Sequence, residues 1–160
     1  FMGDWHHNRN SLNIVTMDYS IRSLEKLGKA FEQFFYFPGN HDLYYKDKRD
    51  VQSVEFAKHI NGVTVVDEIT TIGDSTMVPW LVGEEWKKIP KIKSKYMFGH
   101  FELPNFYMNA MVQMPDTGEL QSKHFVHQDY VFSGHFHKRQ TQGNVTYIGN
   151  AFPHNYADAW

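Results

Sequence analysis

Apolar residues recur every three or four positions between Ile14 and Phe31, and this spacing predicts an amphipathic helix. Gly28 falls near the end of the segment, where glycine often terminates a helix. A similar but shorter pattern from about Asp50 to Ile60 predicts a second helix, which the Asn61-Gly62 turn would end. The apolar face of the first helix would consist of Ile14, Met17, Ile21, Leu24 and Phe31.

Short apolar and β-branched runs predict strands around and after these helices. The run Phe34–Phe37 reads as a buried strand stopped by Pro38-Gly39, and residues 76–82 form a candidate weakened by Pro79. Residues 84–95 are polar and rich in lysine, which predicts a surface helix or loop. Strands mixed with two helices predict a layered α/β fold. The remaining predicted strands are 63–66, 96–98, 130–132 and 145–148.

Four predicted strands or strand remnants end in glycine followed by polar residues. Because ligands of open α/β sheets bind at the carboxyl ends of strands, these residues are candidates for one site. Each glycine would allow the backbone to approach closely just before a side chain that can bind metal. One such motif alone is weak, whereas four in a short chain are a strong signal. The motifs are Gly3-Asp4, Gly39-Asn40-His41-Asp42, Gly99-His100 and Gly134-His135-Phe136-His137.

Composition restricts the chemistry of such a site. The chain has 160 residues, ten histidines and no cysteine, so metal ligands would have to be His, Asp, Glu or Asn. Such donors suit Mn, Fe or Zn better than Ca or Mg. A hydrophobic content of 41% supports one domain or most of one. A net charge of −2 means that DNA binding would need local patches or a partner.

The spacing of His135 and His137 suggests two metals rather than one. In an extended loop the two rings would point to opposite sides, so that each could serve a different ion. Two ions roughly 3.5–4 Å apart form a clamp for displacement at phosphorus. Asp4 is the natural bridging ligand, because its carboxylate has two oxygens and a charge that screens the cations from each other.

The four motifs together resemble motifs two to five of the calcineurin-like metallophosphoesterases. Three flanking stretches resemble, more closely, the nuclease subunits of T-even phage recombination endonucleases and of SbcD-like double-strand-break repair nucleases. The resemblance runs nearly the whole chain and implies a four-layer αββα sandwich that lacks its first strand–helix unit. Residues 1–160 would then be an N-terminally incomplete nuclease domain. The flanking stretches are His41–Lys46, Gly99–Leu103 with Phe106-Tyr107, and Ser133–His137 with Tyr147–Gly149.

The resemblance implies a role for each matching residue. The second metal would be held by Asp4, Asn40, His100 and His135, and the first by Asp4, His137 and two ligands upstream of Phe1. His41 would either protonate the leaving oxygen or stabilise the transition state, and Asp42 would orient it. His7 would be a further catalytic histidine, and Arg9 would contact substrate.

An alternative register takes Asp4-Trp5-His6 as the first motif, Asp-x-His, and makes His6 a ligand of the first metal. We favour the second motif, because only one helix and one strand separate Gly3 from Gly39. Phe101, Phe106 and Tyr107 follow a ligand loop and could stack on a base, although core packing is the simpler reading. His154 is a further candidate for substrate contact. His59 is read as a surface or half-buried structural residue, and His124 and His127 are read as surface residues. Lysines 87, 88, 91, 93 and 95 could contact a phosphate backbone, although a solvated face is the simpler reading.

The function implied is that of a metal-dependent DNA exonuclease or endonuclease subunit in recombination and repair, with two divalent ions, Mn²⁺ being expected. The implied partners are DNA, an SbcC-like coiled-coil ATPase and a second copy of the subunit, with the capping domain and partner-binding segment outside this chain. No segment is apolar enough to cross a membrane, and the expected location is the bacterial cytoplasm. The alternatives are a phosphoesterase acting on small esters and a non-catalytic interaction module on the same scaffold.

Overall fold

The computed structural model describes residues 1–109, 111–154 and 156–158. Its first unit joins the helix α1 (Ile14–Ala30) to the parallel strands β1 (Phe34–Tyr36) and β2 (Val63–Val65). Met2 forms a parallel bridge with Phe37, so the start of the chain runs alongside the end of β1. The 3₁₀ helix η1 (Glu55–His59) leads into β2.

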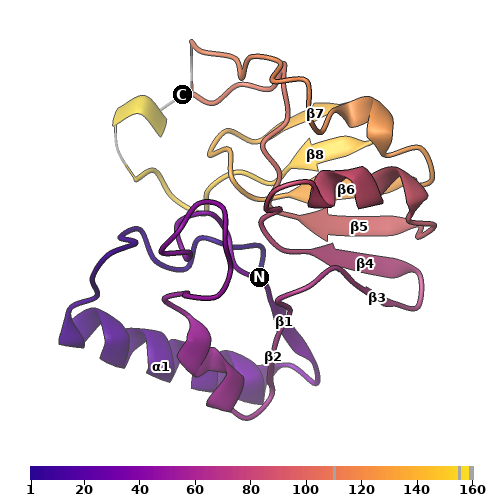
Figure 1. Cartoon of the computed structure of the whole chain (residues 1–160). Coiled ribbons are helices and arrows are strands. Elements are labelled where there is room, and N and C mark those ends of the chain that lie inside the picture. Colours follow the sequence, from indigo (N-terminus) through magenta and orange to yellow (C-terminus); the bar gives the residue numbers. More distant parts are fainter. Residues whose placement is uncertain (110, 155, 159–160) are drawn as a thin grey trace.

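The second unit is a six-stranded sheet in the order β3-β4-β5-β6-β8-β7. Its four central strands run parallel to one another, and each edge strand is antiparallel to the central strand beside it. Figure 1 shows this sheet on one side and α1 with β1 and β2 on the other, the first residues of the chain lying between them. The strands are β3 (Thr70–Ile72), β4 (Ser75–Val78), β5 (Tyr96–Gly99), β6 (Tyr130–Ser133), β7 (Gln140–Gln142) and β8 (Val145–Tyr147).

Both units are held together by apolar cores, to which alternate residues of the strands contribute their side chains. Val78, Met97, Val131 and Val145 lie on one face of the large sheet and are fully buried. The opposite face carries Met77, which packs with Phe37 and Val66 and so joins the large sheet to the small one. In the described residues, η1 is followed by three more 3₁₀ helices: η2 (Glu85–Lys91), η3 (Ser122–His124) and η4 (Tyr156–Asp158).

The helix α1 confirms the predicted element but not its whole apolar face. Asn13 caps its start by accepting a hydrogen bond from the Thr16 backbone NH at 2.8 Å. Leu24 is buried, but Ile14 is 87% exposed and Phe31, just past the helix, is 55% exposed. A 17-residue helix spans about 25 Å, whereas a three-residue strand spans about 10 Å, so the ends of α1 extend beyond the strands they would pack on.

The predicted helix at 50–60 is wrong in length and type, because only the five residues of η1 are helical. Gln52 forms an antiparallel bridge with Leu43, and the Ser53 backbone NH donates to the Asp42 carbonyl at 2.7 Å. These contacts hold the preceding residues extended. The pattern still marked the buried side correctly, since Val54 and Ala57 are both fully buried.

Other strand predictions hold, with two additions. Pro79 ends β4, and the residues beyond it form no strand. The edge strands β3 and β7 were not predicted. The α/β class is confirmed. The four-layer sandwich stays a prediction, because the residues described contain one α-helix, α1, which contacts β2.

Candidate metal centre

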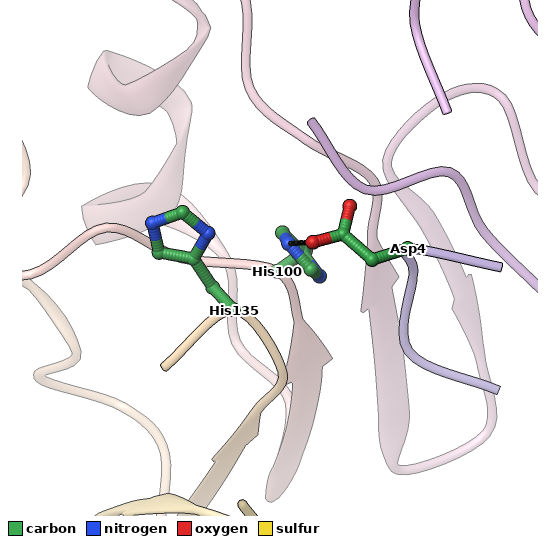
Figure 2. A group of neighbouring side chains, drawn as sticks. All are labelled: Asp4, His100 and His135. Atoms are coloured by element: carbon green, nitrogen blue, oxygen red, sulfur yellow. Dashed lines mark ion pairs between the residues drawn. The ribbon is translucent and has the colours of Figure 1, made fainter. Parts of the chain in front are cut away.

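Three side chains with metal-binding atoms meet at the carboxyl ends of β5 and β6. Asp4, His100 and His135 each offer one ligand atom, and these atoms all lie within 4.8 Å of one another (Figure 2). His100 directly follows β5, and His135 follows β6 after one glycine. Because β5 and β6 are parallel neighbours, their ends place both imidazoles at the same edge. The Met2–Phe37 bridge brings Asp4 to this edge from the other unit.

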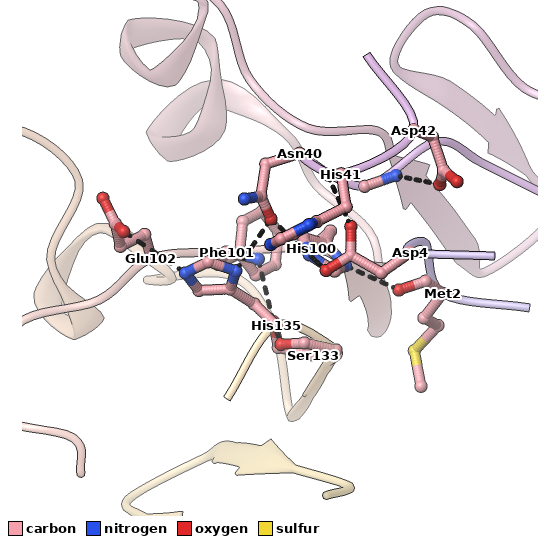
Figure 3. Close-up of polar contacts among 12 residues, drawn as sticks. Met2, Asp4, Asn40, His41, Asp42, His100, Phe101, Glu102, Ser133 and His135 are labelled. Atoms are coloured by element: carbon pink, nitrogen blue, oxygen red, sulfur yellow. Dashed lines mark hydrogen bonds and ion pairs between the residues drawn. The ribbon is translucent and has the colours of Figure 1, made fainter. Parts of the chain in front are cut away.

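Asn40 completes the group (Figure 3), which we call the donor cluster: Asp4, Asn40, His100 and His135. The Asn40 Oδ1 atom lies 3.1 Å from His100 Nε2 and 3.0 Å from His135 Nδ1. The Asp4 Oδ2 atom lies 3.1 Å from His100 Nε2. Two ligand atoms at a right angle, each about 2.1 Å from one ion, would be about 3 Å apart. The structure therefore brings together the four residues predicted for the second metal, with spacings that fit a bound ion.

The protonation of the cluster also suits a cation. Burial disfavours the charged form of Asp4, but the hydrogen bond and charge of His100 and the His41 backbone NH outweigh it and lower the pKa of Asp4 to about 2. Burial likewise opposes charging of His100, and Asp4 outweighs it, so the His100 pKa is raised. His100 Nδ1 donates to the Met2 carbonyl at 2.7 Å, which leaves Nε2 facing the cluster oxygens. A divalent ion would take the place of the Nε2 proton.

His135 reaches both the cluster and Glu102. Burial lowers its pKa, which favours the neutral ring. Its Nδ1 lies 3.0 Å from Asn40 Oδ1 and its Nε2 lies 3.3 Å from Glu102 Oε1, and a neutral ring donates to only one of these two acceptors. In the tautomer that donates to Glu102, Nδ1 turns its lone pair to the cluster, as metal binding would require.

Two of the donors have strained backbones. Asp4 has φ 56° and His135 has φ 85°, values in the left-handed region that residues other than glycine seldom occupy. Only one other residue besides glycine in the described part of the chain, Asn105, has a positive φ. Such strain tends to be stored at functional sites, where it aims a side chain.

The predicted close approach at the strand-end glycines is confirmed. A Cβ added at Gly3 would lie 2.5 Å from His100 Nδ1, and one at Gly134 would lie 2.4 Å from the Met2 carbonyl oxygen. A Cβ at Gly39 would lie 2.3 Å from Asp4 Oδ1. Gly3 also has φ 81°. The glycines therefore let the two units approach until the donor atoms meet.

His41 and His7 lie together at the edge of the cluster. The His41 backbone NH donates to Asp4 Oδ1 at 2.8 Å. Its ring Nδ1 donates to the His7 carbonyl at 2.8 Å, and the two rings stack with centroids 5.2 Å apart. Because a carbonyl can only accept, this bond places a proton on Nδ1 of His41 and leaves Nε2 for other chemistry.

The catalytic role predicted for Asp42, as the residue that orients His41, is wrong. Asp42 is fully buried and accepts hydrogen bonds from Tyr36 Oη at 2.6 Å, the Gly39 NH at 2.9 Å and the His6 NH at 3.1 Å. Burial, which these hydrogen bonds only partly oppose, raises the Asp42 pKa. The carboxylate holds the loop together from inside, while the His7 carbonyl orients His41.

The alternative register, in which His6 binds metal, is contradicted. His6 is 3% exposed, and both of its ring nitrogens are occupied by hydroxyls: Nδ1 by Ser53 and Nε2 by Ser20, each at 2.8 Å. Burial lowers the His6 pKa. His6 therefore serves the packing of α1 against the loop after β1.

His137 lies outside the donor cluster. Its Nδ1 is 2.9 Å from Asp158 Oδ1, and its ring is 5.4 Å from that of His154. Asp158 also accepts from the His154 backbone NH at 2.9 Å and from Asn150 Nδ2 at 3.1 Å. These contacts leave Nε2 of His137 available, as a ligand to a different ion would require. His154 is exposed, and its contact with substrate stays a prediction.

The substrate contact predicted for Phe101 is wrong. Phe101 is 1% exposed and Phe106 is fully buried, both within the main core, so neither ring can stack on a base. Tyr107 is 36% exposed, and its ring lies 4.9 Å from Lys138 Nζ. Arg9 is half-buried, and its contact with substrate stays a prediction. The surface positions predicted for His59, His127 and the five lysines between 87 and 95 are confirmed, whereas His124 is half-buried beside Trp86.

Sequence reasoning missed two carboxylates that support histidines of the site. Glu102 bonds His135, and this hydrogen bond, opposed by burial, lowers the Glu102 pKa. Asp158 supports His137 in the same way. The position of Glu102 two residues after His100 was the available signal, whereas nothing near Asp158 marked it. A carboxylate that accepts from a histidine fixes the ring and raises its basicity toward a metal.

The chain is similar to the exonuclease subunit 1 of Enterobacteria phage T4, with 28% identity over 156 residues. The match covers 92% of this chain but 45% of the relative, so the chain spans less than half the length of that protein. This finding confirms the predicted resemblance to a phage nuclease subunit. No protein-family profile and no solved structure matches the chain, so the metallophosphoesterase assignment continues to rest on the strand-end motifs. In the described residues, no helix is long and apolar enough to cross a membrane.

Proposed function

We propose that this chain forms the catalytic domain of a metal-dependent DNA nuclease subunit that hydrolyses phosphodiester bonds in recombination and repair. The observation that carries the proposal is the donor cluster, in a chain that is similar to a phage exonuclease subunit. We expect two divalent ions; the mixed imidazole, amide and carboxylate donors suit Mn, Fe or Zn, and the resemblance to phage and SbcD-like nucleases favours Mn²⁺ among them.

The donor cluster would hold one ion. Asp4, whose pKa of about 2 keeps it ionised at working pH, supplies the negative charge that a cation needs. His100 is aimed by the Met2 carbonyl and His135 by Glu102, so both rings are oriented before any ion binds. Two bound metal ions would activate water and neutralise negative charge on the phosphate. His137, aimed by Asp158, would share the other ion with Asp4.

His41 is our proposed general acid. Its Nδ1 keeps a proton that it donates in a hydrogen bond to the His7 carbonyl, so Nε2 is the atom that gives or takes a proton at the substrate. The backbone NH of the same residue holds Asp4 Oδ1, which couples the position of the acid to the donor cluster. A neighbouring cationic site would favour transfer of the Nε2 proton of His41 to a leaving oxygen. His7, stacked on the ring, limits its rotation.

The partners belong to the proposal as well. The printed name of the relative calls it a subunit, which supports assembly with another chain. We propose DNA as the substrate, a coiled-coil ATPase as the partner, and a homodimer as the assembly. The lysines exposed between 87 and 95 offer local positive charge in a chain whose net charge is −2.

The test compares cleavage of linear DNA by the purified protein in Mn²⁺ with cleavage by its His135→Ala variant. The matched control is His127→Ala, which removes an exposed histidine that precedes β6, whereas His135 follows that strand. We expect cleavage by the wild type and by the control, loss of at least 100-fold in the His135 variant, and no cleavage in EDTA. Equal cleavage by all three proteins would refute the assignment.

A chromogenic phosphodiester assayed in parallel separates the main alternative. Rapid turnover of that small ester without any DNA cleavage would make the protein a small-molecule phosphoesterase. Failure to bind Mn²⁺ in a calorimetric titration would instead favour a non-catalytic module.

A further inference from the structure

A pocket opens directly beside the donor cluster. It is formed by the loop after β4, η2, the loop after β5 and residues 117–120. Two of its lining residues, His100 and Glu102, also belong to the site: His100 is a donor, and Glu102 holds His135. The Trp80 ring lies 5.4 Å from the His135 ring and 6.0 Å from the His100 ring. Whatever is bound at the cluster therefore has this pocket as its neighbour.

The walls of the pocket are aromatic and aliphatic. Trp80 and Trp86 provide two indoles, and Leu81 and Leu120 provide aliphatic surface. The pocket is small, with a volume of about 80 Å³, and is partly open to solvent, so an occupant would be a single ring with one side left exposed. Both tryptophans are half-buried, so each has a face that packs and a part that remains accessible. Such a pocket suits a flat, weakly polar ring.

The charges of the pocket exclude a phosphate. Its lining contains two glutamates, Glu102 and Glu119, and neither lysine nor arginine. Carboxylates repel phosphate but accept hydrogen bonds from amino groups on the edges of bases. Glu102 already bonds His135, whereas Glu119 is exposed at the pocket mouth. The occupant that matches these features is a planar ring that carries an amino group.

We propose that this pocket receives the nucleobase adjoining the phosphate at the donor cluster, with Trp80 stacking on the base and Glu119 favouring bases that carry an exocyclic amino group over thymine. The inference rests on the proposed nuclease function for the phosphate, and on the pocket itself for the base. It also replaces the stacking role predicted for Phe101, whose ring is buried in the core.

The first experiment measures kcat/KM on single-stranded oligonucleotides that differ at one scanned position near the cleavage point, which carries adenine, cytosine, thymine or no base. At one position we expect an abasic site to lower kcat/KM by about 5- to 100-fold, the range that base–aromatic stacking supports. The kcat/KM for substrates with adenine or cytosine at that position should exceed the value for thymine by about fivefold, which is the lower end of the discrimination that a side-chain contact to a base edge provides.

Variants assign the two effects. Trp80→Leu should remove most of the difference between base and abasic substrates, and Trp80→Phe, which keeps an aromatic face, should restore it. Glu119→Gln should abolish the preference over thymine while the stacking effect stays. Glu32→Gln, an exposed glutamate just past α1, is the matched control and should behave as wild type. Indifference of kcat/KM to the base at every scanned position would overturn the proposal.

The second experiment needs no catalysis. Deoxyadenosine monophosphate should quench the tryptophan fluorescence of the protein in EDTA, and deoxyribose phosphate should not. Trp80→Phe should remove most of the quenching. Quenching without any DNA cleavage would retain the pocket and reject the nuclease function, whereas cleavage without quenching or base dependence would reject the pocket alone.

Discussion

Replacing Gly39 with alanine should weaken metal binding without removing any ligand. The added Cβ would lie 2.3 Å from Asp4 Oδ1, 2.5 Å from the Asp4 backbone nitrogen and 2.7 Å from His100 Cε1. An ordinary contact begins near 3.4 Å, so the Asp4 carboxylate would have to move by about 1 Å. Both neighbours are donors of the cluster, so the strain falls on the site itself.

A displacement of about 1 Å in a preorganised site typically costs about 100-fold in activity, and displaced ligand supports cost about 10- to 100-fold in metal affinity. We therefore expect Gly39→Ala to raise the Kd for Mn²⁺ by about 10- to 100-fold in calorimetric titration. The backbone of Gly39 does not have a positive φ, so alanine adds no conformational strain there.

The matched control is Gly73→Ala, at the turn between β3 and β4, where an added Cβ meets nothing within 4 Å. Because Gly73 has φ 56°, this change should lower the free energy of unfolding by about 1 kcal/mol and leave the Mn²⁺ affinity unchanged. A Kd for Gly39→Ala within twofold of the wild type would refute the geometry on which the donor cluster rests.

Three further predictions concern single side chains. The pKa of Asp4 is lowered from 3.8 to about 2, so the metal-free protein should lose about 2 kcal/mol of stability as the pH falls from about 4 to 2, and Asp4→Asn should lack this loss in acid denaturation curves. His6→Ala should lower the free energy of unfolding by about 2–4 kcal/mol, because the buried Ser20 hydroxyl and the half-buried Ser53 hydroxyl lose their partner, while calorimetry finds the Mn²⁺ affinity unchanged. His41→Asn should lower kcat about 100- to 10,000-fold with no change in Mn²⁺ affinity, and a variant with wild-type kcat would exclude His41 as the acid.

The strand-end residues were predictable because three simple signals coincide there. An apolar run marks the strand, a glycine marks the close turn, and the next side chain is a metal-binding type. The parallel neighbours β5 and β6 then place His100 and His135 at one edge although they lie 35 residues apart, and the packing of the small sheet against the large one brings Asn40 to them.

The loop residues were harder, because their partners lie far along the chain. The sequence Asn40-His41-Asp42 does not indicate that the Asp42 carboxylate points inward to Tyr36 while the His41 imidazole points outward to His7. The edge strands β3 and β7 escaped because their residues are largely polar or exposed, so they carry no apolar alternation.

Aromatic residues near the site were misread for a related reason. A phenylalanine after a ligand loop looks the same whether it faces the core or the substrate, and Phe101 faces the core. Of the tryptophans that border the site, Trp80 lies in the segment predicted as a strand, 76–82, and Trp86 in the lysine-rich segment predicted to be at the surface, 84–95. The pocket becomes visible only in the folded structure, where the loop after β4, η2, the loop after β5 and residues 117–120 pack together.

The central claim is that the donor cluster binds a divalent transition metal. Anomalous diffraction at the manganese edge, from crystals of the protein grown with Mn²⁺, tests it most directly. We predict a peak surrounded by Asp4 Oδ2, Asn40 Oδ1, His100 Nε2 and His135 Nδ1, which disappears in His135→Ala but persists in His127→Ala. Manganese found elsewhere, with this cluster still closed by its own hydrogen bonds, would contradict the account.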